Sequence, residues 1–200
     1  MKKIIGLAVL VGTALGAAPS AQAADGPWMV RGRVLSFQAD ITNDPAVAGA
    51  KVEVDNTVFP EVDFTYFFTK NIAAELILTY PQKLDVTLNG NNIGSLKALP
   101  PTLTVQYHFM PDATFRPYVG VGVNVTLISS VDLPSGVDVD SSSVGPAVQI
   151  GADVKMADKW FLNFDLKKVY IKTDVTVSGA KLTTLKIDPL LASVGVGYRF

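Results

Sequence analysis

The chain has no cysteine and a single histidine, His108, among its 200 residues. Without thiols it can form neither disulfides nor thiolate metal sites, and one imidazole does not make a zinc site. The formal net charge is −1, and no basic patch suited to nucleic acid is present. We therefore expect no metal, no cofactor and no nucleic-acid partner, and a fold that holds without covalent cross-links.

Long apolar runs are equally scarce. One extended run, residues 4–18, follows Lys2 and Lys3. It is shorter than the ~20 residues that a membrane-spanning helix needs, and a small-residue cleavage site ending at Ala23 comes after it. We predict a cleaved signal peptide over residues 1–23 and an exported chain over residues 24–200. A retained N-terminal anchor is the alternative.

The C-terminal segment alternates apolar and small or polar residues with a period of two. One face carries Leu190, Ala192, Val194, Val196, Tyr198 and Phe200, and the other carries Leu191, Ser193, Gly195, Gly197 and Arg199. This alternation suits a strand with one face toward lipid. Because the sequence offers no further candidate for a spanning helix, a membrane protein with this sequence has to be a β-barrel.

Eight segments show this alternation. They cover about residues 28–37, 58–68, 72–80, 101–109, 115–128, 144–156 and 160–171, and a last strand ending at Phe200. Short and long connections alternate between them. The pattern predicts an all-β fold, an eight-stranded antiparallel transmembrane β-barrel with short periplasmic turns and long external loops.

A soluble antiparallel sandwich satisfies the period of two equally well. The aromatic residues argue against it. Trp28, Phe68, Trp160, Tyr198 and Phe200 all fall near the short-turn end of the predicted strands. An aromatic girdle at a membrane interface explains that clustering, whereas a soluble sheet gives no reason for it.

Several stretches of the sequence resemble the OmpW family of outer-membrane proteins. They are Thr69-Lys-Asn-Ile-Ala-Ala-Glu-Leu76, Leu99-Pro-Pro-Thr-Leu103, Phe115-Arg-Pro-Tyr-Val-Gly-Val-Gly-Val-Asn124 and the terminal Gly-Tyr-Arg-Phe200, with Val30-Arg-Gly-Arg33 similar as well. The resemblance implies a narrow barrel in the bacterial outer membrane that passes small hydrophobic molecules, as proposed for the related alkane-uptake proteins. It also implies contact with outer-membrane lipid and lipopolysaccharide, and recognition of the last strand by the barrel-assembly machinery.

Charged residues occupy the inward positions of the periplasmic half. The floor that we predict from them consists of Arg31, Arg33, Glu75, Arg116, Asp153, Asp165 and Arg199. An eight-stranded barrel has room inside only for side chains or one small ligand, and buried charges are costly unless they pair. We expect a salt-bridged floor, with a gated ion pathway as the alternative.

The inward positions of the external half are largely apolar. The predicted lining of a lumen pocket consists of Leu35, Phe37, Ile77, Val169, Ile171 and Leu191, together with Lys167. A water-filled channel would be polar inside, so these residues indicate either an apolar pocket or a dry, packed interior. Lys167 either selects an anionic apolar ligand or reaches down to Asp165 or Glu75.

An apolar solute above a closed floor would have to leave sideways, between strands, into lipid. Pro100, Pro101 and Pro189 lie near the external strand ends, where each removes a ladder donor and weakens pairing. Beyond the membrane, Leu84, Val86 and Leu88 alternate with polar residues, so the third strand is predicted to resume there. Such a segment deepens a pocket or forms a binding surface.

The sequence predicts a channel that admits small hydrophobic or amphipathic molecules. The principal alternative is a structural, adhesive or receptor barrel that acts through external residues 39–56 and 82–98 and has an inert lumen. A lipid-modifying enzyme is less favoured. His108 lies at the periplasmic end of its strand, and the chain has no Gly-x-Ser-x-Gly motif, so we predict no catalytic residue.

Overall fold

The computed structural model describes residues 26–44 and 51–200. The predicted signal peptide, residues 1–23, lies outside this part of the chain. Within the described residues, no helix is long and apolar enough to cross a membrane.

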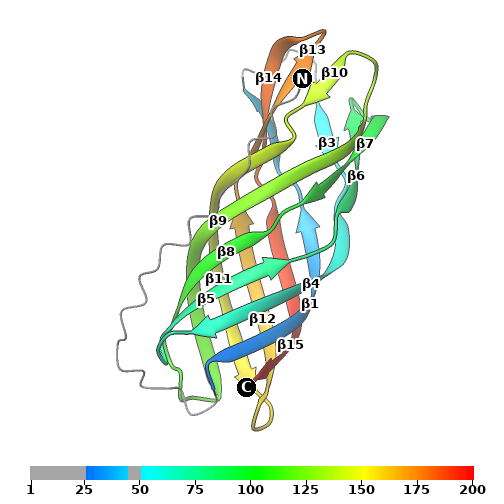
Figure 1. Ribbon diagram of the computed structural model, residues 1–200. Coiled ribbons are helices and arrows are strands. Elements are labelled where there is room, and N and C mark those ends of the chain that lie inside the picture. Colours follow the sequence, from blue (N-terminus) through cyan, green and yellow to red (C-terminus); the bar gives the residue numbers. More distant parts are fainter. Residues whose placement is uncertain (1–25, 45–50) are drawn as a thin grey trace.

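Eight antiparallel strands close into a barrel (Figure 1). They are β1 (Trp28–Gln38), β4 (Thr57–Phe67), β5 (Ile72–Leu78), β8 (Thr102–His108), β9 (Phe115–Asp132), β11 (Ser142–Lys155), β12 (Trp160–Val169) and β15 (Leu190–Arg199). The first strand pairs with the last, and pairing of β9 with β11 completes the ring. The predicted fold class is confirmed.

The barrel wall separates an apolar outer surface from a polar interior. Val121 and Val123 on β9 are about half exposed or more, whereas Tyr118 on the inward face is fully buried. Aromatic rings gather at the short-turn end, where Trp160 stacks edge-on against Tyr198 with ring centroids 5.0 Å apart. An outer band of this kind matches lipid, with the rings at its periplasmic boundary.

The long external connections are, over most of their described length, further strands. They comprise β2 (Ile41–Asp44), β3 (Val52–Val54), β6 (Gln82–Leu88), β7 (Asn91–Leu99), β10 (Val137–Val139), β13 (Ile171–Val177) and β14 (Ala180–Ile187). Strands β7, β6 and β3 continue the sheet beside the upper part of β9, and β10, β13, β14 and β2 form a second sheet. Both extensions stand above the barrel in Figure 1.

Two tight hairpins build these extensions. Asn89 and Gly90 join β6 to β7 with φ of 52° and 80°, and Ser178 and Gly179 join β13 to β14 with φ of 52° and 81°. Two consecutive residues with positive φ form the turn that matches the twist of paired strands. The predicted resumption of the third strand is confirmed as β6. The Asn-Gly pair after it was a hairpin signal that the sequence analysis did not use.

Gly195 of β15 lies opposite Arg33, in a part of the barrel interior that is too closely packed for a larger side chain. A Cβ atom there would collide with the carbonyl oxygen of Gly32 and stand 2.6 Å from the Arg33 Cα. We expect Gly195→Ala to lower the free energy of unfolding by roughly 1–3 kcal/mol, as overpacking does. Urea unfolding in lipid vesicles measures the effect.

Gly32→Ala is the matched control, because a Cβ atom at Gly32 has nothing within 4 Å. Equal stability of the two variants would show that the interior around Arg33 is loosely packed.

Candidate functional site

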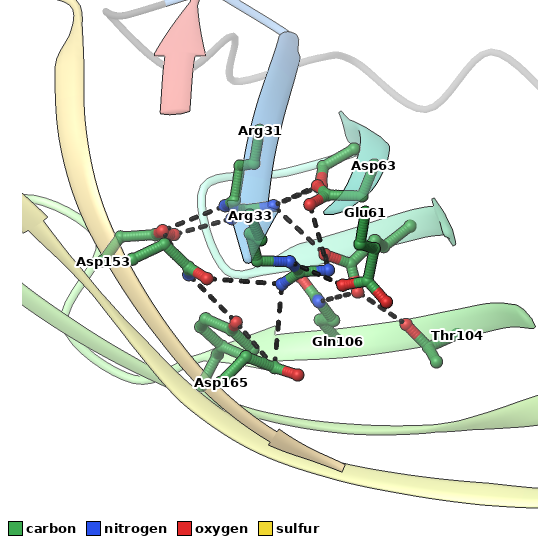
Figure 2. A network of polar contacts seen from close by, with 12 residues as sticks. Arg31, Arg33, Glu61, Asp63, Thr104, Gln106, Asp153 and Asp165 are labelled. Carbon is green, nitrogen blue, oxygen red and sulfur yellow. Dashed lines mark hydrogen bonds and ion pairs between the residues drawn. The ribbon is translucent and has the colours of Figure 1, made fainter. Parts of the chain in front are cut away.

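Arg31 is the centre of a buried ion-pair network inside the barrel (Figure 2). Its guanidinium group lies 2.9 Å from Asp63, 3.2 Å from Glu75 and 2.7 Å from Asp153. All four side chains are essentially inaccessible to solvent. Their strands surround the lumen, so this one cation links opposite sides of the wall.

Arg33 lies two residues further along β1, on the same face, and makes a second set of contacts. Its nitrogens lie 2.8 Å from Glu61, 3.0 Å from Asp63, 3.4 Å from Glu75 and 3.9 Å from Asp165. Figure 2 shows both arginines held between carboxylates that belong to different strands. Shared carboxylates join the two sets into one network.

Neutral side chains complete this network. Gln106 and Gln149 each donate to Glu75 at 2.8 Å, and the Tyr118 hydroxyl donates to Asp165 at 2.9 Å. Buried charges need such hydrogen bonds in addition to their ion pairs. We call the network of Arg31, Arg33, Glu61, Asp63, Glu75, Asp153, Asp165 and Lys167 the floor.

The structure brings five of the seven residues of the predicted floor into this network. Arg116 and Arg199 lie instead toward the periplasmic end. The Arg116 guanidinium stands 4.9 Å from the centre of the Phe161 ring, and that of Arg199 stands 3.7 Å from the centre of the Phe67 ring. Cations stack favourably on aromatic faces, so these two arginines contact rings below the floor.

Glu61 belongs to the floor and was missed by the sequence analysis. It is 4% exposed and lies two residues before Asp63 on β4, on the same face. The alternation of side chains along β4 would therefore have identified Glu61 as an inward-facing residue.

Lys167 reaches downward into the floor. Its Nζ lies 3.4 Å from Glu61 and 3.7 Å from Asp165, and the side chain is 1% exposed. The sequence left two interpretations of Lys167 open, selection of an anionic ligand or contact with the carboxylates below it. The structure shows contact with Asp165, as predicted, and with Glu61 rather than Glu75.

An apolar layer lies directly above the floor. Leu35, Phe37, Val169, Ile171 and Leu191 pack together with Phe59 and Ala147. A small space of about 30 Å³, which we call the lower cavity, is lined by all seven residues predicted to line the pocket, and also by Phe59 and Glu61. The predicted lining residues therefore lie together, although the space between them is only large enough for about one water molecule.

A larger apolar cavity of about 360 Å³, the upper cavity, lies among the external extensions. Of the predicted lining, only Phe37 and Ile171 reach it. Its other walls include Ile41, Val54, Leu84, Val86, Ile128 and Leu185. Leu84 and Val86 belong to the segment that was predicted to deepen a pocket. Ile41, Val54 and Leu185 were missed because their segments were treated as loops, although Leu185 and Ile187 follow a period of two.

The wall contains an interruption between β4 and the β5–β6 segment. The ladder from β4 to β5 ends at Val62 paired with Leu78. The next ladder position on β4 is Pro60, which has no N–H to donate. Its carbonyl accepts a hydrogen bond from the Thr79 hydroxyl at 3.0 Å, so this edge of Pro60 faces β5.

Side chains replace the missing backbone pairing. Continuing the register places Tyr80 opposite Pro60, and the Tyr80 carbonyl accepts a bond from the Gln82 amide at 2.8 Å. The next backbone bond across this gap joins the Asp55 N–H to the Asp85 carbonyl at 3.4 Å. We call the stretch between residues 56–61 and 79–84 the seam. Phe59 and Gln82 on its two sides also line the upper cavity.

Backbone pairing continues at two of the prolines singled out from the sequence. The Pro101 carbonyl accepts from the Val125 N–H at 2.9 Å, and the Pro189 carbonyl accepts from the Val169 N–H at 3.2 Å. The carbonyl groups of these two prolines therefore keep each strand hydrogen-bonded to its neighbour. The interruption lies at Pro60 instead.

The closed wall, the lipid-facing exterior and the aromatic boundary define an integral β-barrel of the bacterial outer membrane, crossing it many times and contacting its lipids. The OmpW family model matches residues 26–200. The chain belongs to the OmpW family, as the sequence analysis predicted.

Relatives agree with this assignment. The chain is 41% identical to the outer-membrane protein y4mB of Sinorhizobium fredii, over 87% of this chain and 80% of that protein. It is 32% identical to outer membrane protein W of Vibrio cholerae, over 98% of each chain. A dibenzothiophene metabolism operon protein, PahQ of Pseudomonas aeruginosa, is 29% identical over 89% of this chain and 90% of its own length.

The fold is also similar to solved structures. The crystal structure of the outer membrane protein OprG from Pseudomonas aeruginosa matches with a TM-score of 0.73 and 28% identity, over 88% of this chain and 96% of that chain.

The floor gives a second prediction. Arg33→Met would leave Glu61 and its neighbouring carboxylates without their principal cation, and breaking a buried pair costs about 3–5 kcal/mol. We expect a loss of folding stability of that order. Lys51→Met is the control, since the exposed pair with Glu53 at 2.8 Å is worth only about 0–1 kcal/mol. Similar losses in both variants would mean that the interior charges are solvated.

Proposed function

We propose that this protein is an outer-membrane channel that admits small hydrophobic or amphipathic molecules. The observation that carries the proposal is the upper cavity, an apolar space of about 360 Å³ on the external side of a closed, charged floor. Its volume lies in the range of ligand-binding pockets. Apolar surface leaves water for such a space spontaneously.

The floor favours a sideways exit over an axial one. An axial path through the floor would require the separation of buried ion pairs, among them Arg31 with Asp153 at 2.7 Å. An apolar solute offers nothing to replace those contacts. Backbone pairing of the wall is interrupted at the seam beside the same cavity, and lipid is the favourable environment for an apolar solute. We infer that solutes leave the barrel through the seam.

The relatives support a hydrophobic solute. PahQ, by its name, belongs to an operon of dibenzothiophene metabolism, and dibenzothiophene is an apolar aromatic compound. The residues predicted to line the pocket, with Lys167 beneath them, form the lower end of the proposed path.

The surroundings of His108 support a protein without catalytic activity. His108 is 2% exposed and contacts the Gln106 amide oxygen at 3.1 Å. Its ring lies 5.0 Å from the rings of both Phe67 and Tyr118. A histidine enclosed in this way has no access to a lipid substrate.

We also propose that lipopolysaccharide surrounds the external half and that the barrel-assembly machinery recognises β15.

An adhesive or receptor barrel with an inert lumen is the second candidate. The observation that favours it is the height of the two external extensions, which present β-hairpins beyond the membrane (Figure 1). A charge placed inside the upper cavity separates the two functions, since it would spare a binding surface on the outside.

We expect Val86→Arg to abolish the protein-dependent uptake of a labelled apolar compound, because a buried charge in the upper cavity opposes entry of an apolar solute. Val86 is 6% exposed and lines this cavity. Thr87→Arg on the same strand, on the other face, is the matched control. Cells with an intact outer membrane and no protein give the baseline. Uptake that is unchanged by Val86→Arg would favour the adhesive barrel.

The seam gives a separate prediction. Pro60→Val supplies an N–H opposite the Tyr80 carbonyl, which favours extension of the ladder across the seam. We expect slower uptake with unaltered binding in the upper cavity. Pro101→Ala is the control, because the carbonyl of residue 101 already takes part in the ladder. Equal uptake rates for native protein and Pro60→Val would rule out exit at this place.

A further inference from the structure

Glu61 occupies the place where the floor, the lower cavity and the seam meet. It lies on the seam edge of β4 next to Pro60, and it lines the lower cavity. Its carboxylate contacts Arg33 at 2.8 Å and Lys167 at 3.4 Å. On the path that we propose, a solute passes from the upper cavity to the seam beside this carboxylate.

The cations beneath this path are already shared among several carboxylates. Arg31 contacts three of them, Arg33 contacts four and Lys167 contacts two. The floor as a whole combines five carboxyl groups with three cations. An arriving anion would therefore meet more carboxyl groups than cations and would have to displace a carboxylate of the protein from its ion pair.

Neutral polar groups at the lower cavity are also engaged. The Asn124 amide donates to the Thr102 hydroxyl at 2.8 Å and to the Pro100 carbonyl at 3.2 Å. The Asn124 oxygen accepts from the Thr126 hydroxyl at 2.6 Å. These groups have no donor to spare for an anionic head group, whose burial without hydrogen bonds is very costly.

Resting on the proposed function, we infer that the site discriminates by the charge of the head group. It takes amphipathic molecules with an uncharged head, such as fatty alcohols, and it excludes those with an anionic head, such as fatty carboxylates. Glu61 is the specificity-determining residue. Lys167 does not recruit the anion, because it is already paired with Glu61 and Asp165.

Two probes with the same alkyl chain test this inference, 1-dodecanol and dodecanoate, at pH 8 where the carboxylate is ionised. Native protein in phosphatidylcholine vesicles is loaded with radiolabelled 1-dodecanol, and each unlabelled probe is titrated in as competitor. We expect dodecanoate to be at least about tenfold weaker than 1-dodecanol, since repulsion between like charges at low dielectric is strong. Protein-free vesicles correct for partition into lipid.

Glu61→Gln removes the charge and keeps the shape. We expect dodecanoate to approach the strength of 1-dodecanol in this variant, so that the ratio of the two affinities moves toward one. Glu53→Gln makes the same chemical change on an external strand, where the side chain is 47% exposed, and should retain the native ratio. Lys167→Met changes the same ion pair from the other side and should still exclude dodecanoate.

Equal competition by the two probes in native protein would overturn the inference while leaving the proposed function standing. So would a ratio that Glu61→Gln does not change, or strong binding of dodecanoate that Lys167→Met abolishes. Absence of specific 1-dodecanol binding in native protein would overturn both the proposed function and the inference.

Discussion

In the hydrocarbon core of a membrane, a backbone N–H or C=O group has no water to bind, so every strand needs a partner on each side. Closure of β9 onto β11 meets this requirement for the barrel. The rest of the architecture depends on it. Eight strands make a ring whose interior holds only side chains or a small ligand.

Closure also explains the floor. The inward charges of β1, β4, β5, β11 and β12 point into one narrow volume, from which water is largely excluded. Arg31 and Arg33 lie at its centre and contact carboxylates on several of these strands. Such a network contributes little net stability compared with an apolar core. It does, however, fill the barrel interior with paired side chains, and it divides the molecule into a charged periplasmic half and an external half that holds the apolar upper cavity.

The seam is the place where the continuous backbone pairing of the wall is interrupted. Pro60 lacks the donor that the next ladder position requires, and side-chain bonds from Thr79 and Gln82 occupy the gap. Pro101 and Pro189 still accept a backbone N–H of the neighbouring strand, whereas the Pro60 carbonyl accepts a side-chain hydroxyl instead. Phe59 and Gln82 on the two sides of the seam line the upper cavity, and Glu61 follows Pro60 on β4.

The period of two was sufficient to predict the eight strands, their inward and outward faces and most residues of the floor. Together with the order of residues along β1, it placed Leu35 and Phe37 above Arg31 and Arg33, as the structure shows. It did not place Arg116 and Arg199 below the floor, because the face of a strand gives no height across the barrel. Height depends on strand tilt and register, which arise only when the sheet closes.

The external half was less predictable for a related reason. Segments such as residues 171–187 are rich in polar residues and resemble loops, yet they pair as β13 and β14 and enclose the upper cavity. The sequence by itself determined which residues face lipid and which face inward, because a strand alternates its side chains strictly. Only the tertiary structure decided which inward residues meet and where backbone pairing of the wall is interrupted, because contacts across a barrel join residues that are distant along the chain.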